Sequence, residues 1–458
     1  MHKAILEELA EFAVGLSFEE IPKSVIHQAN RCLLDLLGCY WGGWRAEKNR
    51  ELLALALRMN PNPQTTIWGV GTKAGMAEAA LAHGCMAHHF EYDDGISLGA
   101  HWGSESIPAA VAMAELTGRG SHDLLAAIIV SYEVGNRVSQ AFSEQLLSRG
   151  VHFPCMMGVF GATTGVARLA GLNASQTAGA LGNACLTPIA VYRPALTGDP
   201  IKDAYAGWPN ALGILLTLLS QAGWAGPSDL LEGEKGLGEI LGSMSSGREL
   251  RKRILRGLGS TYEIMKTYFK PYPCCRWLHA PVRAILDLKQ EGQWSGEEIA
   301  SFRVEGPAFL KSYGKKIGFE KEIAARFSLP YVAAAAALYG RLGLEEFDAN
   351  RRQDPILKKM VQHVQFGADP ALDKVFPHRF RTRVKIRLKN GKRWEKECGL
   401  PWGPDDPPTK KEMAEKFSYL ANGVLHPTQI DQWLAFFSGG IEKDTGLENF
   451  FQFLAERI

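Results

Sequence analysis

The sequence of 458 residues has no excess of charge of one sign. Its 51 lysine and arginine residues are balanced by 49 aspartate and glutamate residues, so the formal net charge is +2. Proteins that bind nucleic acid or a membrane surface through bulk electrostatics carry a basic face, and no basic run dominates here. We therefore expect no nucleic-acid partner and no membrane partner. An anionic substrate would have to be attracted by a few local cations.

Long hydrophobic runs and paired cysteines are also missing. The longest apolar stretches, such as Leu212–Leu219, are far too short to cross a bilayer, and the first residues form an amphipathic pattern with acids inside it. The eight cysteines are scattered without a Cys-x-x-Cys pair, which is typical of reduced thiols and not of a disulfide framework or a zinc site. These absences predict a cytoplasmic protein without a signal peptide.

Neither glycine-rich stretch completes a nucleotide-binding fingerprint. Gly69–Ala74 lacks the third glycine and the surrounding βαβ pattern of a dinucleotide site. Gly158–Gly165 has no Lys-Ser/Thr ending and lies within a helical pattern. We interpret both as glycines that allow close packing.

Helical patterns dominate what is present. Capping signals and helical periodicity recur through the first 260 residues, whereas period-two alternation is almost absent. After about residue 265 the pattern changes: Arg379–Leu388 alternates, and Asn390-Gly391 predicts a type I′ hairpin into Arg393–Cys398. A proline-rich linker, Pro401–Pro408, precedes further helices. The prediction is a mainly α fold, with a large all-helical domain built from both termini (1–265 together with 403–458) and a smaller α+β lid domain (266–402) inserted between them.

The segment Met265–His279 concentrates cations at this change of pattern. Two prolines stiffen the backbone from Lys270 to Pro273, and aromatic residues surround the charges. Such a segment can bind an anion and exclude water from it, or it can simply cross between domains with solvated charges. Both interpretations stay open for its cationic residues, which are Lys266, Lys270, Arg276 and His279.

A second polar cluster runs from His88 to Asp94, with His101 shortly after it. A helix predicted over Ala74–Asp94 would place His89 and Asp93 one turn apart, a spacing that a metal ion accepts. Solvated charges at a helix end are the alternative. A carboxylate that orients a histidine or a lysine is the simplest interpretation and is favoured over metal binding.

Three further residues combine chemistry with an unusual position. His152 precedes a predicted helix, where the positive end of the dipole favours a neutral imidazole and bound anions. Lys202 opens a helix, where a cation is unfavourable, so it is either solvated or retained for function. Tyr331 follows Pro330, close to Arg326.

Taken together, these segments resemble the MmgE/PrpD family, which includes 2-methylcitrate dehydratase, cis-aconitate decarboxylase and iminodisuccinate epimerase. The matching pieces follow one another over nearly the whole chain. They are Leu33–Gly38, Ala79–Asp94, Gly150–Pro154, Gly161–Leu172, Ile201-Lys202 with Ala206-Gly207, Gly226-Pro227 with Leu231–Gly233, Lys270–Arg276 with His279, Phe327–Tyr331, Gly403-Pro404 with Pro407-Pro408, and Lys416-Phe417.

The resemblance implies a homodimer with an active-site cleft between the two domains and neither a metal nor an organic cofactor. The residues at family active-site positions are Asp93, His101, His152, Lys202, Lys270 and Tyr331. Cys275 and His279 lie close by, and with Arg276 they are predicted to bind the substrate. Two positions depart from the family pattern: this chain has His101-Trp102 where His-Pro is usual, and Cys275 stands where decarboxylase-like members tend to carry histidine.

The implied chemistry breaks a bond next to a carboxylate of a small di- or tricarboxylate. His101 and His152 are predicted to act as acid and base, Lys202 and Lys270 to hold the anion, Tyr331 to donate to an oxyanion, and Asp93 to orient His101. Which histidine takes the proton is left open. We expect a cofactor-independent lyase similar to 2-methylcitrate dehydratase. The alternatives are an epimerase or racemase of an iminodisuccinate-like diacid, a cis-aconitate-type decarboxylase, and a catalytically silent ligand-binding dimer.

Overall fold

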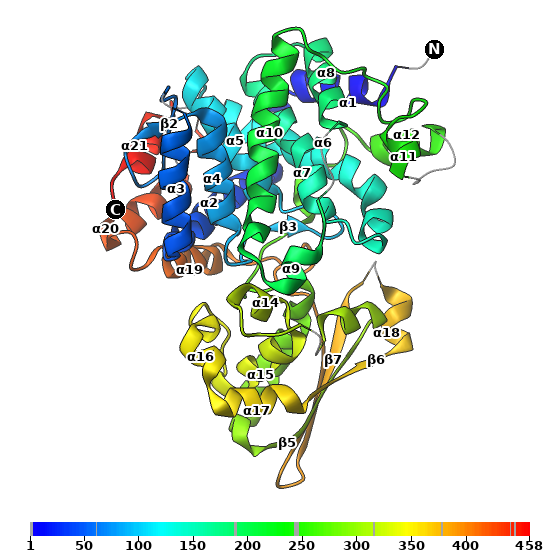
Figure 1. Ribbon diagram of the computed structural model, residues 1–458, viewed down its shortest axis with the longest axis vertical. Coiled ribbons are helices and arrows are strands. Elements are labelled where there is room, and N and C mark those ends of the chain that lie inside the picture. The colour runs from blue at the N-terminus through cyan, green and yellow to red at the C-terminus, as the bar shows by residue number, and fades with distance from the viewer. Residues whose placement is uncertain are drawn as a thin grey trace.

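The fold is mainly α-helical, as the sequence predicts (Figure 1). The computed structural model describes residues 3–60, 62–186, 190–241, 247–314, 317–376, 379–439, 441–443 and 446–458. Buried apolar side chains of these residues form two separate hydrophobic cores. Among them no helix combines the length and apolar composition that a membrane crossing requires.

The first core is built by helices from the first half of the chain. They are α1 (Ile5–Gly15), α2 (Lys23–Gly43), α3 (Glu47–Met59), α4 (Met76–His88), α5 (Trp102–Thr117), α6 (Ser121–Ser148), α7 (Phe153–Leu169), α8 (Ala174–Ala184), α10 (Ala204–Gln221), α11 (Leu237–Leu241) and α12 (Gly247–Leu255). The short helix α9 (Arg193–Thr197) between α8 and α10 instead packs Ala195 into the second core. The glycine-rich run of α7 packs closely on its neighbours: a Cβ on Gly165 would lie 2.2 Å from Ser131 Oγ on α6. These glycines therefore serve close packing, as predicted.

The last helices return to this first core. They are α19 (Lys410–Ala421), α20 (Pro427–Phe437) and α21 (Glu448–Ala455), drawn in orange and red beside the blue N-terminal helices in Figure 1. Lys416 on α19 donates to Asp35 Oδ1 on α2 at 2.6 Å and to the Tyr92 carbonyl oxygen at 2.7 Å. A buried ion pair thus fastens the end of the chain to its beginning.

The second core packs helices on a four-stranded sheet. The strands are β5 (Ile299–Gly306), β6 (Val364–Ala368), β7 (Arg381–Leu388) and β8 (Arg393–Gly399), in the order β6-β5-β7-β8, and only β5 and β6 are parallel. The helices are α13 (His279–Gly292), α14 (Glu322–Phe327), α15 (Leu329–Tyr339), α16 (Ala349–Gln353), α17 (Pro355–His363) and α18 (Pro370–Val375). Phe302, Val304, Val384 and Ile386 alternate with polar residues along β5 and β7 and face the core.

The hairpin between β7 and β8 forms where the sequence predicts it, but its turn is different. A type I′ turn needs positive φ at both central residues, whereas here Gly391 has φ 88° and Asn390 does not have positive φ. The Gly391 amide donates to the Leu388 carbonyl at 2.9 Å. The connection is therefore a three-residue loop, a type I turn closed by a left-handed glycine.

Two short strands connect the cores. β3 (Gly95–Ile96) lies in the loop after α4 and pairs antiparallel with β4 (Thr267–Tyr268), which leads into the second core. Beside β4, the Phe269 amide donates to the Trp402 carbonyl at 2.9 Å, so the outgoing and returning chains lie next to each other. A further pair, β1 (Thr65–Thr66) and β2 (Lys73–Ala74), lies in the first core.

Candidate active site

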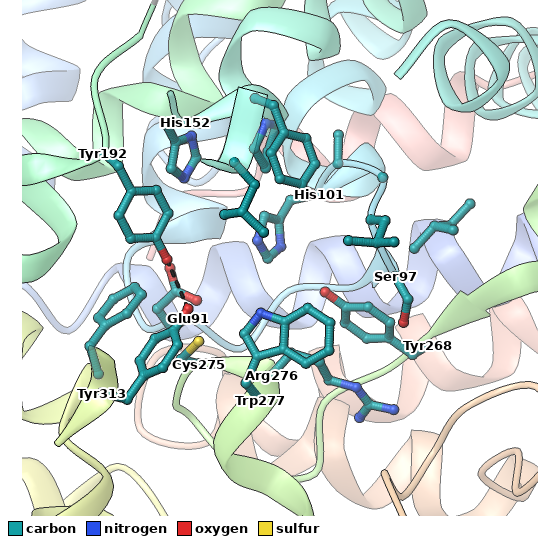
Figure 2. A pocket seen from close by; sticks show the side chains of 18 residues that line it. Glu91, Ser97, His101, His152, Tyr192, Tyr268, Cys275, Arg276, Trp277 and Tyr313 are labelled. Atoms are coloured by element: carbon teal, nitrogen blue, oxygen red, sulfur yellow. Dashed lines mark hydrogen bonds between the residues drawn. The ribbon is translucent and has the colours of Figure 1, made fainter. Parts of the chain in front are cut away.

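A cleft with about 700 Å³ of empty space, partly open to solvent, lies where the two cores meet. Figure 2 shows Glu91, Tyr192, Cys275 and Tyr313 gathered at one side of the cleft, with His101 and His152 near them. The first half of the chain contributes Glu91, Ser97, His101, His152 and Tyr192, and the second core's side contributes Cys275, Trp277 and Tyr313. This cleft brings together two of the six predicted catalytic residues directly, His101 and His152.

The loop between α4 and α5 positions the acidic residues. The predicted helix over Ala74–Asp94 is wrong at its end, because α4 stops at His88 and Glu91 adopts a left-handed backbone with φ 52°. His89 and Asp93 are therefore not one helical turn apart, and His89 Nδ1 instead contacts Asp203 at 2.7 Å. The broken helix turns Glu91 toward the cleft.

Glu91 is the centre of a buried charged cluster. One of its oxygens pairs with the Lys202 ammonium group, and the other accepts from Lys270 Nζ at 3.0 Å. Lys270 Nζ also lies 3.7 Å from Asp93 Oδ1. Burial alone would raise the pKa of Glu91, but Lys202 and Lys270 outweigh it and hold that pKa well below its ordinary value.

The two lysines predicted to hold the anion therefore do not reach the cleft directly. Lys202 and Lys270 are completely buried, and neither lines the cleft. Burial would lower the pKa of Lys270, yet Glu91 and Asp93 reverse this and raise it above its ordinary value. Two ammonium groups thus stand behind one carboxylate that faces the cavity.

The backbone carbonyl of Asp94 fixes the tautomer of His101. His101 Nδ1 lies 2.9 Å from that oxygen, which can only accept, so Nδ1 carries the proton and Nε2 of the neutral ring carries the lone pair. Burial lowers the pKa of His101 to about 4, with Asp93 opposing. His101 is therefore a neutral ring with a free basic nitrogen at neutral pH.

Asp93 lies closer to His88 than to His101, the histidine that the sequence analysis expected it to orient. Its Oδ2 accepts from His88 Nδ1 at 2.8 Å and from Ser104 Oγ at 2.5 Å, whereas His101 Nδ1 is 3.5 Å away. Burial opposes ionisation of Asp93, but His88 and the other nearby bases hold its pKa below the ordinary value. Asp93 orients His88, and the Asp94 backbone orients His101.

His152 has the opposite tautomer. It is the N-cap of α7, and its Nδ1 accepts from the Cys155 amide at 3.4 Å, so the neutral ring carries its proton on Nε2. Burial, followed by His88, His101 and Lys202, lowers the pKa of His152 well below its ordinary value. The cleft therefore contains one imidazole that can accept a proton and one that can donate one.

His88, Asp93 and His101 lie close enough together to be considered as metal ligands. His88, Asp93 and His101 place possible ligand atoms within 4.8 Å of one another. However, Nδ1 of His101 is used by Asp94, Nδ1 of His88 is used by Asp93, and the Lys270 ammonium group already provides a cation 3.7 Å from Asp93. This geometry favours a hydrogen-bonded network of acids and bases.

The remaining predicted residues divide between the cleft and its supports. Cys275 and Arg276 line the cleft, and burial raises the pKa of the Cys275 thiol to about 12. His279 is buried, with Nε2 3.0 Å from the Cys274 carbonyl oxygen. Tyr331 donates to the Glu346 carbonyl at 2.6 Å and lies between Phe319 and Phe347, away from the residues that line the cleft.

Trp102 does not line the cleft. Its indole is fully buried and points into the first core, where a Cβ on Gly135 would lie 2.3 Å from it and a Cβ on Gly161 2.9 Å. Its Nε1 donates to Asn136 Oδ1 at 3.2 Å. Two glycines on α6 and α7 thus provide the space for this side chain.

Sequence reasoning missed several polar residues of the cleft, namely Glu91, Ser97, Tyr192, Tyr268 and Tyr313. Glu91 lies inside the motif that was singled out, and its position among His88, Asp93 and Asp94 was the available signal. Tyr192 and Tyr313, whose hydroxyl oxygens are 3.1 Å apart, both pack in or against the second core and carry no local signal.

Family models match most of the chain. The MmgE/PrpD N-terminal domain matches residues 7–249, and the MmgE/PrpD C-terminal domain matches residues 272–435. The chain belongs to the MmgE/PrpD family.

Curated relatives from this family cover nearly the same length. The chain is 24% identical over 449 residues to cis-aconitate decarboxylase of Aspergillus terreus, which covers 93% of this chain and 91% of the relative. It is 23% identical over 442 residues to cis-aconitate decarboxylase of Mus musculus, with 93% and 88% covered. It is 22% identical over 377 residues to 2-methylcitrate dehydratase of Escherichia coli K12, with 78% and 76% covered.

Proposed function

We propose that this MmgE/PrpD protein is a cofactor-independent lyase that acts on a small di- or tricarboxylate and removes a proton next to a carboxylate. The reaction we favour is a dehydration similar to that of 2-methylcitrate dehydratase. The observation that carries the proposal is the pair of complementary imidazoles in one cleft: His101 with a basic Nε2, and His152 with a proton on Nε2.

Dehydration needs both of these histidines. Nε2 of His101 takes a proton from the carbon beside a carboxylate, and the electron pair spreads into that carboxylate as a dianionic enolate. The enolate then expels the hydroxyl group, which leaves as water after taking the Nε2 proton of His152. The products are an alkene, water, a protonated His101 and a deprotonated His152, and transfer of one proton restores the resting state.

Lys202 and Lys270 supply the positive charge that an enolate needs. Both are fully buried in a region where charges interact more strongly than in water. Tyr192 and Tyr313 close the cleft on the opposite side with hydroxyl groups that can donate to a carboxylate. Tyr331 has its proton committed to Glu346 and in this proposal supports the wall of the second core.

Turnover assays with 2-methylcitrate, citrate and cis-aconitate test the proposal. A dehydratase produces an unsaturated acid that absorbs in the near ultraviolet and has lost the mass of one water. In deuterated water an epimerase would exchange the α-hydrogen without any other change in mass. No turnover and no calorimetric binding of any of these acids would refute the substrate class.

Decarboxylation of a cis-aconitate-like acid is the second candidate, because the relatives that match 93% of the chain are named cis-aconitate decarboxylases. Loss of carbon dioxide needs an acid to protonate the resulting carbanion but no base. His152 would then be required and His101 would not. The same assay separates the two reactions, since a decarboxylase releases carbon dioxide.

We also propose that two copies associate through α10. This helix contains no charged residue, yet Trp208 and Leu215 are 48% and 49% exposed, and Trp224 just beyond it is 76% exposed. In Figure 1 the helix runs along the front of the first core. Because this face has no charged residue, it cannot form ion pairs with a charged partner. Two copies of the face can pack on each other around a two-fold axis.

Light scattering after size exclusion tests the dimer. The wild type is expected at twice the mass of one chain, and the double variant Trp208→Glu, Leu215→Glu at the mass of one chain. Leu55→Glu changes a similarly exposed leucine on α3 (42%) and should leave the mass at that of the dimer. A dimeric double variant would refute this interface. The eight free cysteines, five of which are buried, support a cytoplasmic location.

A further inference from the structure

The buried cluster around Glu91 is electrically balanced by its own side chains. Lys202 and Lys270 contribute two positive charges, and Glu91 and Asp93 contribute two negative ones, all within one hydrogen-bonded and ion-paired cluster. The four side chains are at most 5% exposed. A dicarboxylate or tricarboxylate that binds against this cluster therefore adds at least two negative charges beside four buried groups whose net charge is zero, and Arg276 is a further cation in the lining of the cleft.

Glu91 stands between the cavity and both lysines. Its side chain lines the cleft, whereas Lys202 and Lys270 do not, and each lysine donates to a different oxygen of the same carboxylate. Its backbone is also held in the left-handed region at φ 52°, which is unfavourable for a residue other than glycine. A substrate carboxylate cannot reach either ammonium group unless Glu91 moves.

We propose that Glu91 holds the place of a substrate carboxylate in the empty enzyme, and that a polycarboxylate displaces it from Lys202 and Lys270 while Glu91 takes up one proton from solvent. This inference rests on the proposed substrate class. Glu91 is then a positioning residue: it keeps the two lysines charged and aligned until the anion arrives. Its displacement without protonation would leave an unpaired carboxylate in a buried site, which is strongly unfavourable.

Titratable groups from several elements surround Glu91. Once Lys202 and Lys270 bind the ligand, none of these other groups replaces the positive charge that neutralised the Glu91 carboxylate. His88 Nε2 lies 3.5 Å from Glu91 Oε1 and has no hydrogen-bond partner among the described residues. The other titratable groups that interact with Glu91 are Lys202, Lys270, His101, His152, Tyr192, Cys274 and Cys275. Nδ1 of His88 is used by Asp93, so its free Nε2 can accept a hydrogen bond from the protonated carboxyl group of Glu91, whose proton comes from solvent.

Titration calorimetry with tricarballylate tests the inference. This saturated tricarboxylate has no hydroxyl group and no double bond, so it binds without dehydration or decarboxylation. Runs at one pH in two buffers of different ionisation enthalpy give the number of protons taken up. Between pH 7 and 8.5 the wild type is expected to take up about one proton per ligand, so its Kd rises about tenfold per pH unit.

Glu91→Gln is expected to remove the coupling between ligand binding and proton uptake. Glutamine keeps the shape but needs no proton, so proton uptake should fall by about one, and the affinity at pH 8.5 should rise at least tenfold relative to the wild type. Glu105→Gln is the matched control. Glu105 is also completely buried, but burial raises its pKa well above the ordinary value, so it is already neutral and its replacement leaves the charge balance unchanged.

The outcomes separate the two proposals. Tight binding to the wild type without proton uptake would overturn the inference about Glu91 and leave the substrate class standing. Weaker binding to Glu91→Gln with proton uptake unchanged would overturn it as well. Absence of binding of tricarballylate and citrate to the wild type would overturn both.

Discussion

His101 donates from Nδ1 to the backbone carbonyl of Asp94, 2.9 Å away, within a single loop. That loop is held in turn by the Asp94 carboxyl group, which accepts from the Gly103 amide at 2.9 Å and from the Tyr132 hydroxyl at 2.6 Å. Burial raises the pKa of this carboxyl group to about 7. The basic nitrogen of His101 is thus set by backbone geometry and does not depend on a charged partner.

His101→Gln should lower kcat by about 10²–10⁴-fold, because glutamine cannot accept the proton. KM should change little, since Lys202 and Lys270 remain in place. Steady-state kinetics with the acid that the turnover screen selects provide the measurement. His363→Gln, at an exposed helix end in the second core, is the control and should keep full activity. An unchanged kcat in His101→Gln would mean that the base is elsewhere.

The free energy of unfolding should fall as the pH falls from about 6.5 to 4. Burial lowers the pKa of His101 to about 4 and that of His83 to about 3, whereas the unfolded chain binds these protons near pH 6.5. Within this window only the unfolded state gains protons, at about 1.4 kcal/mol per pKa unit and group. Urea unfolding at pH 7.5, 6 and 4.5 measures the slope. His83→Gln should flatten it, and an equal slope in that variant would contradict the assignment.

Gly135→Ala should destabilise the first core by about 1–3 kcal/mol, because the new Cβ would lie 2.3 Å from the Trp102 indole. Thermal unfolding measures the loss. Gly15→Ala is the control, since its Cβ would meet nothing within 4 Å. Adding Trp102→Leu to Gly135→Ala should recover part of the loss, and strict additivity of the two changes would argue against direct contact.

Lys416→Met should cost about 3–5 kcal/mol, because it leaves Asp35 as a buried charge without its partner. Asp35→Asn in the same chain should restore much of this stability. Lys411→Met breaks an exposed pair with Glu415 on the same helix and should leave urea unfolding unchanged within error. Equal effects of the two lysine substitutions would refute the role of the buried pair.

Glu105→Gln should stabilise the protein, and more so at higher pH. Burial raises the pKa of Glu105 well above its ordinary value, and both of its oxygens lack hydrogen-bond partners among the described residues. As the pH rises above about 4.5, the unfolded glutamate loses its proton while the folded one keeps it, so the wild type loses stability that glutamine does not lose. Melting temperatures at pH 5 and pH 8 measure the difference, and a gap that shrinks with pH would contradict this.

The sequence predicts the helical class and the strands well because periodicity and capping are local signals. Sequence-based prediction fails where a single backbone φ angle determines where a helix ends or which turn type forms. The pattern over Ala74–Asp94 is helical throughout, and only the left-handed Glu91 ends α4 at His88. The hairpin after Leu388 was placed correctly for the same local reason, but its turn type depends on φ at Asn390.

The sequence predicts which residues belong to the site, but it does not predict the hydrogen bonds and ion pairs that connect them. Motif position together with the family resemblance leads to His101, His152, Lys202 and Lys270, but burial and hydrogen-bond partners decide what each can do. The two lysines reach the cleft only through Glu91, and Tyr331 is committed to the Glu346 carbonyl. The Tyr192–Tyr313 contact joins segments 121 residues apart, and no spacing rule connects them.

The bond from Lys416 to the Tyr92 carbonyl has a consequence for how the protein is made. Tyr92 lies between Glu91 and Asp93, and its support comes from a helix 324 residues later in the chain. While the chain grows on the ribosome, the acidic loop exists long before the ammonium group that holds it from behind. The site is therefore completed only after α19 has emerged, so it cannot form while the first half of the chain alone has been made.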